Sequence, residues 1–242
     1  MILFLTSNTF RERVRCEDKG EMIPDNGLVD ELRRCFPDPC RALYFCDDPD
    51  DKDNDFLADI FRDAFEYSGF RFEQFTCVDA RNAAQTAELI KESNFIILGG
   101  GHLPTQNRFF NDIGLCKLIK EYDGLILAIS AGSMNSADEV YMMPEFEGEA
   151  FDPKLRGFSS GLGLTKTIVI PHYDDFRNET LDGLRIMEDI VYPDSKGRII
   201  YAIPDGSYIY VKDGLEELRG EGYVIKDGTI KQISANGNSV LL

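Results

Sequence analysis

The sequence predicts an α/β fold: a doubly wound, mostly parallel sheet with helices on both faces and a C-terminal antiparallel β annex. Three observations predict it. Short apolar runs alternate with amphipathic stretches over the first two thirds of the chain. The clearest of these runs are apolar on both faces, as strands in a covered parallel sheet must be. From about residue 198, short β runs instead follow one another across turn dipeptides.

The predicted parallel strands are four apolar runs, at residues 2–6, 42–46, 94–98 and 124–129. Between them, residues 55–68 carry Phe61, Phe65 and other apolar residues at helical spacing. Residues 79–92 form another predicted helix, with Asp79 as its N-cap. Strands that alternate with helices in this way form βαβ units, which build a doubly wound sheet.

The annex is predicted from turn dipeptides. Tyr223–Lys231 is a hairpin signal, since the two-residue turn Asp227-Gly228 separates two β runs. Asp205-Gly206 and Asp213-Gly214 are further turn dipeptides between short β runs. The sequence contains no internal repeat and no low-complexity linker. We therefore expect residues 1–242 to form a single domain that includes the annex.

Charge excludes several functions. The chain of 242 residues has 26 Lys+Arg against 43 Asp+Glu, a net charge of −17, and no concentrated basic patch. Binding to nucleic acid or to an anionic membrane is therefore not expected. The acidic stretch from Asp47 to Asp55 is expected to be a solvated loop.

The sequence also bears on the compartment. No run approaches the ~18–20 apolar residues of a membrane span, and the short apolar N-terminus lacks the basic leader of a secretory signal. No cysteines form a C-x-x-C pair, and no His is placed to complete a zinc pattern, so we expect a cytoplasmic protein with reduced thiols and no metal. The cysteines are Cys16, Cys35, Cys40, Cys46, Cys77 and Cys116.

A serine stands at a predicted strand–turn–helix junction. The buried run ends at Ile129, and Ser130 is followed by the small residues Ala131 and Gly132. Small neighbours permit a sharp turn that lifts the hydroxyl above the sheet edge, with free N–H groups of a helix start beside it. An ordinary N-cap serine is the alternative interpretation of the pattern alone.

Three glycines, Gly99, Gly100 and Gly101, follow the strand at 94–98. Such a loop lies at the edge where α/β sheets bind ligands, and its N–H groups can stabilise an oxyanion. A plain turn is the alternative. The loop lacks the G-x-x-x-x-G-K-[ST] pattern, so it is not a nucleotide-binding P-loop.

Only two histidines, His102 and His172, can serve as a general base of the usual kind. His172 ends an apolar strand, whereas His102 follows the glycine loop and is poorly placed to accept the serine proton. We therefore favour His172 as base and keep His102 as a candidate lining residue. Asp205 follows the apolar run 199–203 and is the best-placed acid to orient His172. The competing acids are Asp174 and Asp175.

These segments together resemble the peptidase E family of serine peptidases, whose fold is similar to that of class I glutamine amidotransferases. The resemblance runs from Leu5-Thr6-Ser7-Asn8 to the C-terminal hairpins. Four motifs carry it, in the family's order: Gly99-Gly100-Gly101, Ser130-Ala131-Gly132, Pro171-His172 and Pro204-Asp205-Gly206.

By position, the resemblance implies a nucleophile at Ser130, a base at His172 and an orienting acid at Asp205, where the family often has glutamate. It implies oxyanion donors in the N–H of Ala131 and of Gly100 or Gly101. No cofactor is implied, and the partner is a small peptide substrate.

The sequence departs from the family at the substrate side. Leu181 stands where the family's aspartyl dipeptidases have an arginine for the substrate carboxylate, and a leucine cannot pair with a carboxylate. Arg177 and Arg185 are the nearby candidates for that role. The glycine-rich and acid-rich segment 142–162 is a candidate cap over the site.

The function expected is thus hydrolysis of small peptides by a dipeptidase-like serine peptidase. A cyanophycinase-like hydrolase and a catalytically silent binding module on the same scaffold are the two alternatives. The oligomeric state stays open, with a homodimer as one option.

Overall fold

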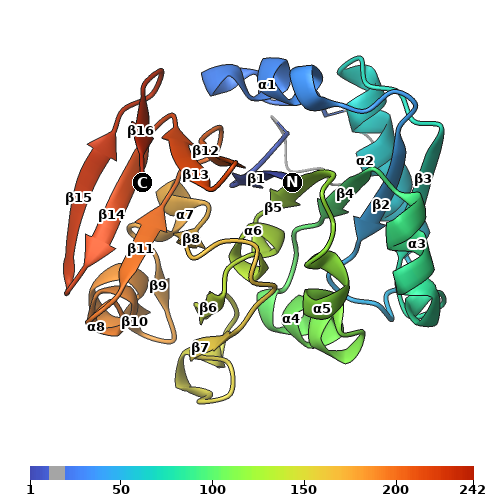
Figure 1. The fold of residues 1–242 in the computed structure, drawn as a ribbon. Helices are drawn as coiled ribbons and strands as arrows, with labels where there is room; N and C mark the ends of the chain where they lie inside the picture. Colours follow the sequence, from blue (N-terminus) through green and yellow to red (C-terminus); the bar gives the residue numbers. More distant parts are fainter. Residues whose placement is uncertain (11–19) are drawn as a thin grey trace.

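The computed structural model describes residues 1–10 and 20–242 and has a mixed α/β architecture around a large central sheet (Figure 1). In spatial order the strands of this sheet are β16 (Ser239–Leu241), β13 (Leu215–Arg219), β12 (Tyr208–Lys212), β1 (Ile2–Thr6), β5 (Leu125–Ile129), β4 (Phe95–Leu98), β2 (Arg41–Phe45) and β3 (Gln74–Val78).

The strands from β1 to β3 in this order are mutually parallel. The four apolar runs predicted as parallel strands are confirmed as β1, β2, β4 and β5. Every residue of β4 and β5 is buried, because helices cover both faces of the sheet there. Strand β12 pairs antiparallel with β1 and extends the sheet on the other side.

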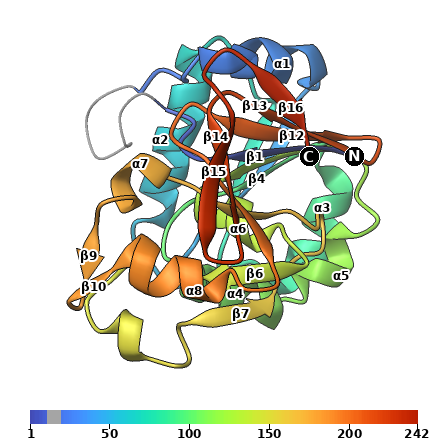
Figure 2. The same cartoon turned by 90° about the vertical axis from the view of Figure 1, so that its left-hand side faces the viewer.

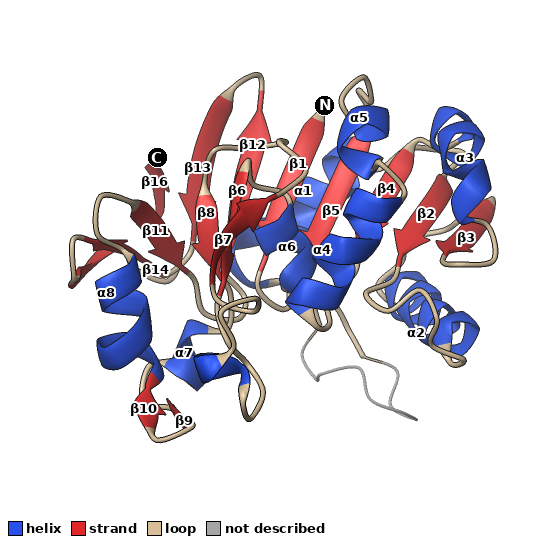
Figure 3. Cartoon of the chain, turned by 90° about the horizontal axis from the view of Figure 1, so that it is seen from below, coloured by secondary structure: helices blue, strands red, loops and turns tan. Residues whose placement is uncertain are grey.

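Eight α-helices are described, and the first six of them are divided between the two faces of this sheet. In chain order they are α1 (Leu28–Cys35), α2 (Asn54–Tyr67), α3 (Thr86–Glu92), α4 (Leu103–Asp112), α5 (Leu115–Ile119), α6 (Ala131–Asn135), α7 (Tyr173–Phe176) and α8 (Tyr192–Asp194). Helices α1 and α2 cover one face, and α3 to α6 cover the other (Figures 1 and 3). The doubly wound arrangement is therefore confirmed.

Aromatic rings hold α1 and α2 to the sheet. Phe36, just after α1, lies 4.8 Å from Phe70 and 5.5 Å from Phe95 of β4, measured between ring centroids. Phe65 of α2 lies 6.0 Å from Phe95 in an edge-to-face arrangement. Such pairs add to the area burial that stabilises the layer.

A second sheet lies to the left of the central sheet in Figure 1, and its strands β14 and β15 face the viewer in Figure 2. Its strands, in order, are β15 (Thr229–Ser234), β14 (Gly222–Lys226), β11 (Ile199–Ala202) and β8 (Ile168–Ile170). The C-terminal β runs are thus divided, since β12, β13 and β16 extend the central sheet while β14 and β15 join β11. Within this second sheet β8 and β11 are parallel, so their carboxyl ends lie side by side.

The predicted hairpin at Asp227-Gly228 is confirmed, and the turn dipeptide Asp213-Gly214 also joins two paired strands. Asp227 and Gly228 have φ of 49° and 82°, and Asp213 and Gly214 have φ of 53° and 78°. Both central residues of each turn are therefore left-handed, as a type I′ turn between twisted strands requires.

Two short hairpins, three 3₁₀ helices and one π-helix complete the described elements. The hairpins pair β6 (Glu139–Met142) with β7 (Gly157–Ser160), and β9 (Thr180–Leu181) with β10 (Leu184–Arg185). The 3₁₀ helices are η1 (Asp25–Gly27), η2 (Ala83–Gln85) and η3 (Glu149–Phe151), and η4 (Ile186–Val191) is a π-helix.

The prediction that Asp79 caps a helix is wrong. The 3₁₀ turn η2 begins at Ala83 and α3 only at Thr86. The Asp79 carboxylate instead accepts the backbone N–H and guanidinium of Arg81, while Asn82 Oδ1 accepts the N–H of Asp79. These local bonds hold the segment as a turn in place of the first helical turn.

The described cysteines are free thiols, and Cys16 lies outside the described residues. Burial raises the pKa of Cys40 to about 12 and that of Cys35 to about 11. Both thiols are therefore held in the protonated, unreactive form. No helix of residues 1–10 and 20–242 is long and apolar enough to cross a bilayer.

Candidate active site

Ser130 lies at a strained turn between β5 and α6. Its φ and ψ are 51° and −116°, a conformation that serine rarely adopts. Its backbone N–H is held by the carbonyl oxygens of Thr6 at 3.0 Å and Ser7 at 3.1 Å, at the end of β1. The turn lifts the serine out of the sheet, as the strand–turn–helix pattern predicts.

Gly132 allows this turn to sit against the neighbouring strand. A Cβ at this position would lie 2.3 Å from the carbonyl oxygen of Leu98 and 2.8 Å from that of Gly99. A Cβ carbon cannot approach a backbone oxygen so closely. The glycine is therefore required for the contact between α6 and the loop that follows β4.

His172 and Asp205 complete a hydrogen-bonded chain with Ser130. His172 Nε2 lies 2.8 Å from Ser130 Oγ, and His172 Nδ1 lies 2.7 Å from Asp205 Oδ1. An ionised carboxylate only accepts, which assigns the ring proton to Nδ1 and leaves Nε2 to accept from the serine hydroxyl. The imidazole is thus in the tautomer that a general base for Ser130 needs.

The second sheet brings the histidine and the acid together. His172 follows β8 and Asp205 follows β11, and Ala202 is in register with Ile170 across these parallel strands. Ile203 N–H donates to the carbonyl of Ile170 at 2.9 Å, so the pairing continues toward both side chains. Figure 3 shows α7, which starts just after His172, beside the lower ends of the parallel strands, where their carboxyl ends lie.

Ser7 is a member of this cluster that the sequence reasoning did not single out. It is fully buried, and its Oγ lies 2.6 Å from Asp205 Oδ1 and 2.7 Å from the backbone nitrogen of His172. A signal for it exists in the sequence. Ser7 follows the strand at 2–6 as Ser130 follows the strand at 124–129. These two strands pair in parallel, with Thr6 opposite Ile129.

The glycine loop lies directly against Ser130. A Cβ on Gly100 would be 3.1 Å from the Cβ of Ser130. Within the described part of the chain, no hydrogen bond occupies the N–H groups of Gly100, Gly101 or Ala131. Backbone N–H groups beside a serine hydroxyl, and not already engaged, are what an oxyanion hole requires.

Asp47 supports the far end of this loop. Its carboxylate accepts the backbone N–H of His102 at 3.1 Å and fills the space where a Cβ on Gly101 would lie. Gly101 has a φ of 143°, which favours glycine there for a second reason. The acidic stretch from Asp47 to Asp55, predicted as a solvated loop, thus begins with a residue whose carboxylate contacts the glycine loop.

His102 is engaged away from Ser130. Its Nδ1 lies 2.7 Å from Thr105 Oγ1 and its Nε2 lies 2.8 Å from Glu149 Oε1. Glu149 Oε2 also accepts the N–H groups of Glu145 and Phe146. Part of the candidate cap segment 142–162 is therefore tied to the residue that follows the glycine loop, and of the two histidines only His172 is hydrogen-bonded to Ser130.

The two candidate substrate-binding arginines are paired with acids. Arg177 lies 3.2 Å from Asp174, and Arg185 lies 2.9 Å from Asp189. Leu181 is half-buried in β9. A substrate carboxylate would have to compete with an aspartate for either arginine.

Glu145 should make the stability of the protein depend on pH. Burial, with the Glu149 carboxylate nearby, raises the pKa of Glu145 from its ordinary 4.5 to about 7. Between these values the folded chain keeps a proton that the unfolded chain has released, so stability falls as pH rises through this window. At about pH 8, Glu145→Gln is expected to be about 1–3 kcal/mol more stable than wild type in urea unfolding.

The advantage of Glu145→Gln should vanish at about pH 4, where both states are protonated. The exposed neighbour Glu147 provides the matched control, since Glu147→Gln should change stability little at either pH. An advantage of equal size at both pH values would contradict this account of Glu145.

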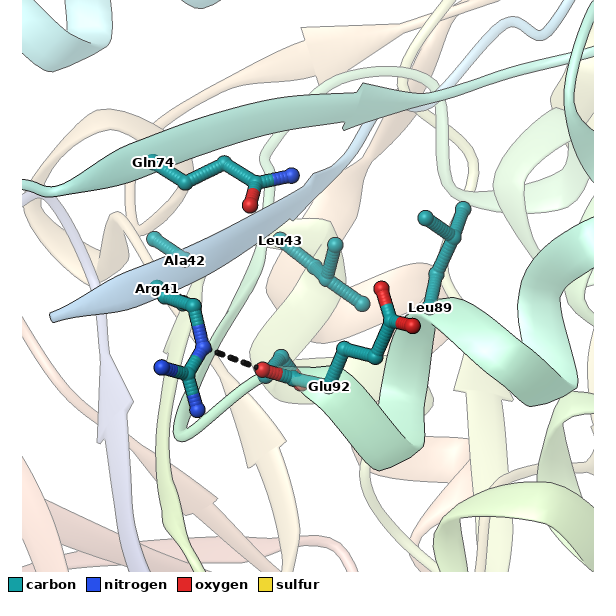
Figure 4. A pocket seen from close by; sticks show the side chains of 7 residues that line it. Arg41, Ala42, Leu43, Gln74, Leu89 and Glu92 are labelled. Atoms are coloured by element: carbon teal, nitrogen blue, oxygen red, sulfur yellow. Dashed lines mark hydrogen bonds between the residues drawn. The ribbon is translucent and has the colours of Figure 1, made fainter.

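A small pocket elsewhere on the molecule is distinct from this cluster (Figure 4). It lies at the amino-terminal ends of β2 and β3, where Arg41 Nε donates to the carbonyl of Glu92 at 2.7 Å. Because these strands are parallel to β5, it occupies the opposite edge of the sheet from Ser130. Its free space is about 10 Å³, enough for a single water.

Comparison with known proteins places the chain in a family. The sequence pattern of Peptidase family S51 matches residues 49–218, more than two thirds of the chain. The chain belongs to peptidase family S51. It is accordingly a serine-type peptidase, a hydrolase, and the resemblance to peptidase E drawn from its motifs is confirmed.

A solved structure has the same fold. A candidate peptidase E protein from Listeria monocytogenes EGD-e aligns over 96% of this chain and 98% of its own, with a TM-score of 0.60 at 16% identity. No curated protein sequence matches this S51 chain. The family match includes the glycine loop, Ser130, His172 and Asp205, whereas Ser7 lies before it.

Proposed function

We propose that this S51 peptidase hydrolyses small peptides, as a dipeptidase does, through Ser130, His172 and Asp205. The observation that carries the proposal is the continuous chain of hydrogen bonds from Ser130 Oγ through the imidazole to Asp205, at 2.8 and 2.7 Å. A serine hydroxyl becomes nucleophilic only when a base takes its proton, and the base needs a partner that fixes its tautomer.

In the proposed first step, Ser130 Oγ attacks the scissile carbonyl carbon while His172 Nε2 takes the hydroxyl proton. The negative charge that develops on the carbonyl oxygen is stabilised by the N–H of Ala131 and that of Gly100 or Gly101. The C–N bond then breaks, and His172 returns the proton to the leaving amine. Asp205 stabilises the imidazolium throughout this step.

In the second step, water attacks the acyl-enzyme. His172 takes a proton from the water, and the C–O bond to Ser130 breaks as Ser130 regains its proton. The N–H of Ala131 and that of Gly100 or Gly101 also stabilise the second oxyanion. Protein groups and water supply every proton and electron pair in this sequence.

The candidate substrate-binding residues support a preference for peptides that does not require an acidic residue in the substrate. Arg177 and Arg185 are neutralised by Asp174 and Asp189, and Leu181 offers no charge. A substrate carboxylate gains little from an arginine that is already paired. We therefore propose neutral small peptides as the substrate class.

A dipeptide-library cleavage assay tests this proposal. We expect release of free amino acids by wild type, with neutral N-terminal residues cleaved at least as well as aspartate, and no release by Ser130→Ala. A strict requirement for N-terminal aspartate would overturn the substrate class. If no dipeptide is cleaved but a polymer of aspartate and arginine is, the result would point instead to the cyanophycinase-like reaction. If no substrate is cleaved, the result would favour the catalytically silent binding module.

A further inference from the structure

We infer that Ser7 is a positioning residue of the catalytic cluster, an inference that rests on the proposed roles of Ser130, His172 and Asp205. Ser7 is the first residue after β1 and is fully buried. Its hydroxyl contacts both the backbone of the proposed base and the carboxylate of the proposed acid. Because it has no exposed surface, it acts on these residues and not on the substrate.

The hydrogen bonds of Ser7 have one consistent arrangement. The backbone N–H of His172 donates to Ser7 Oγ at 2.7 Å, so the oxygen accepts there. The single hydroxyl proton is then donated to Asp205 Oδ1 at 2.6 Å. The remaining contact, 3.4 Å to His172 Nδ1, needs no proton from Ser7, since Nδ1 donates its own proton to Asp205.

This arrangement adds a constraint to each of the two groups that Ser7 contacts. His172 has a φ of 54°, a left-handed conformation seen in only a few per cent of residues other than glycine. The bond from its N–H to Ser7 holds the backbone in that conformation. The Asp205 side chain is 39% exposed, so water competes for its oxygens, and the buried hydroxyl keeps Oδ1 facing the imidazole.

The same chain segment also holds the nucleophile. The carbonyl oxygens of Thr6 and Ser7 accept the N–H of Ser130, which has a φ of 51°. The end of β1 therefore contacts all three members of the proposed triad, although they come from three other strand ends. One buried hydroxyl links two of them directly, which gives Ser7 a role in geometry beyond filling space.

The reactivity of Ser130 toward a fluorophosphonate probe tests this inference without knowledge of the natural substrate. We expect Ser7→Ala to lower the maximal rate of labelling by about 10–100-fold while the concentration for half-maximal rate changes less than twofold. Thr9→Val is the matched control and should label as wild type does. Thr9 is equally buried and its hydroxyl bonds only to Thr6 in the described structure.

A double-mutant cycle separates positioning from a general loss of structure. If Ser7 acts largely through Asp205, then Ser7→Ala should cost clearly less in an Asp205→Ala background than in wild type. Should Ser7→Ala fail to give folded protein by circular dichroism, Ser7→Cys replaces it. The cysteine side chain has a volume similar to that of serine, and its S–H is a weak donor. We therefore expect an intermediate loss of labelling rate.

Labelling of Ser7→Ala, or of Ser7→Cys in its place, within twofold of wild type would overturn the inference. So would an equal loss with and without Asp205. A failure of the proposed function is a different result, because Ser130→Ala would then keep its label or wild type would take none.

Discussion

Replacing Ser130 with alanine should lower kcat/KM by about 10⁴–10⁶-fold on the best dipeptide of the library. Without the hydroxyl, His172 has no proton to take and no acyl-enzyme can form. The residual rate would come from the N–H groups of the glycine loop and of Ala131, which still bind the oxyanion of a direct water attack. Steady-state kinetics against purified wild type measures the difference.

Ser136→Ala is the matched control for this substitution. Ser136 lies just after α6 and is fully buried, whereas Ser130 is half-buried, and the Ser136 hydroxyl donates only to the carbonyl of Gly132 in the described structure. We expect its kcat/KM to stay within a few-fold of wild type. A Ser130→Ala variant that keeps more than about one hundredth of wild-type activity would be incompatible with Ser130 as nucleophile.

Gly132→Ala is expected to destabilise the protein by about 3 kcal/mol or more, although alanine is the better helix former by about 1 kcal/mol. The new methyl group would lie 2.3 Å from the carbonyl oxygen of Leu98, and that atom belongs to the backbone of a central strand. The packing conflict exceeds the gain in propensity. Relief of the clash also moves the glycine loop away from Ser130, so activity should fall together with stability.

Comparing the free energies of unfolding in urea of Gly132→Ala and Gly114→Ala isolates the packing effect. Gly114 has open space around its Cβ position but a φ of 65°, so its replacement costs only backbone strain, about 1 kcal/mol. The two losses should therefore differ clearly, with the larger at Gly132. Equal stability of Gly132→Ala and wild type would mean that α6 does not press on the glycine loop.

Much of the fold was predictable because burial leaves a clear pattern in sequence. Strands β4 and β5 are covered on both faces, and so they appear as unbroken apolar runs. The division of the C-terminal strands between two sheets was not predictable, since β12 and β14 have similar alternation and differ only in their partners. The Asp79 error arose because an aspartate before a helix can bond a neighbouring arginine as readily as cap the helix.

The candidate site was predictable to the extent that each residue ends a strand. Ser130, His172 and Asp205 follow β5, β8 and β11, and the structure brings the three side chains within hydrogen-bond distance. Ser7 also ends a strand, but no chemistry of its own marks a lone serine in sequence. The pairing of Arg177 and Arg185 with nearby acids depends on side-chain conformations, which the sequence does not specify.

Ser130 is proposed to be a nucleophile activated by His172 and Asp205. Mass spectrometric mapping of the fluorophosphonate adduct tests this role of Ser130 most directly, because the reagent forms a covalent bond only with an activated hydroxyl. We predict one adduct, on the tryptic or chymotryptic peptide that contains Ser130, and no adduct in Ser130→Ala. An adduct on another serine, or peptide cleavage by a protein that takes no label at Ser130, would contradict the claim.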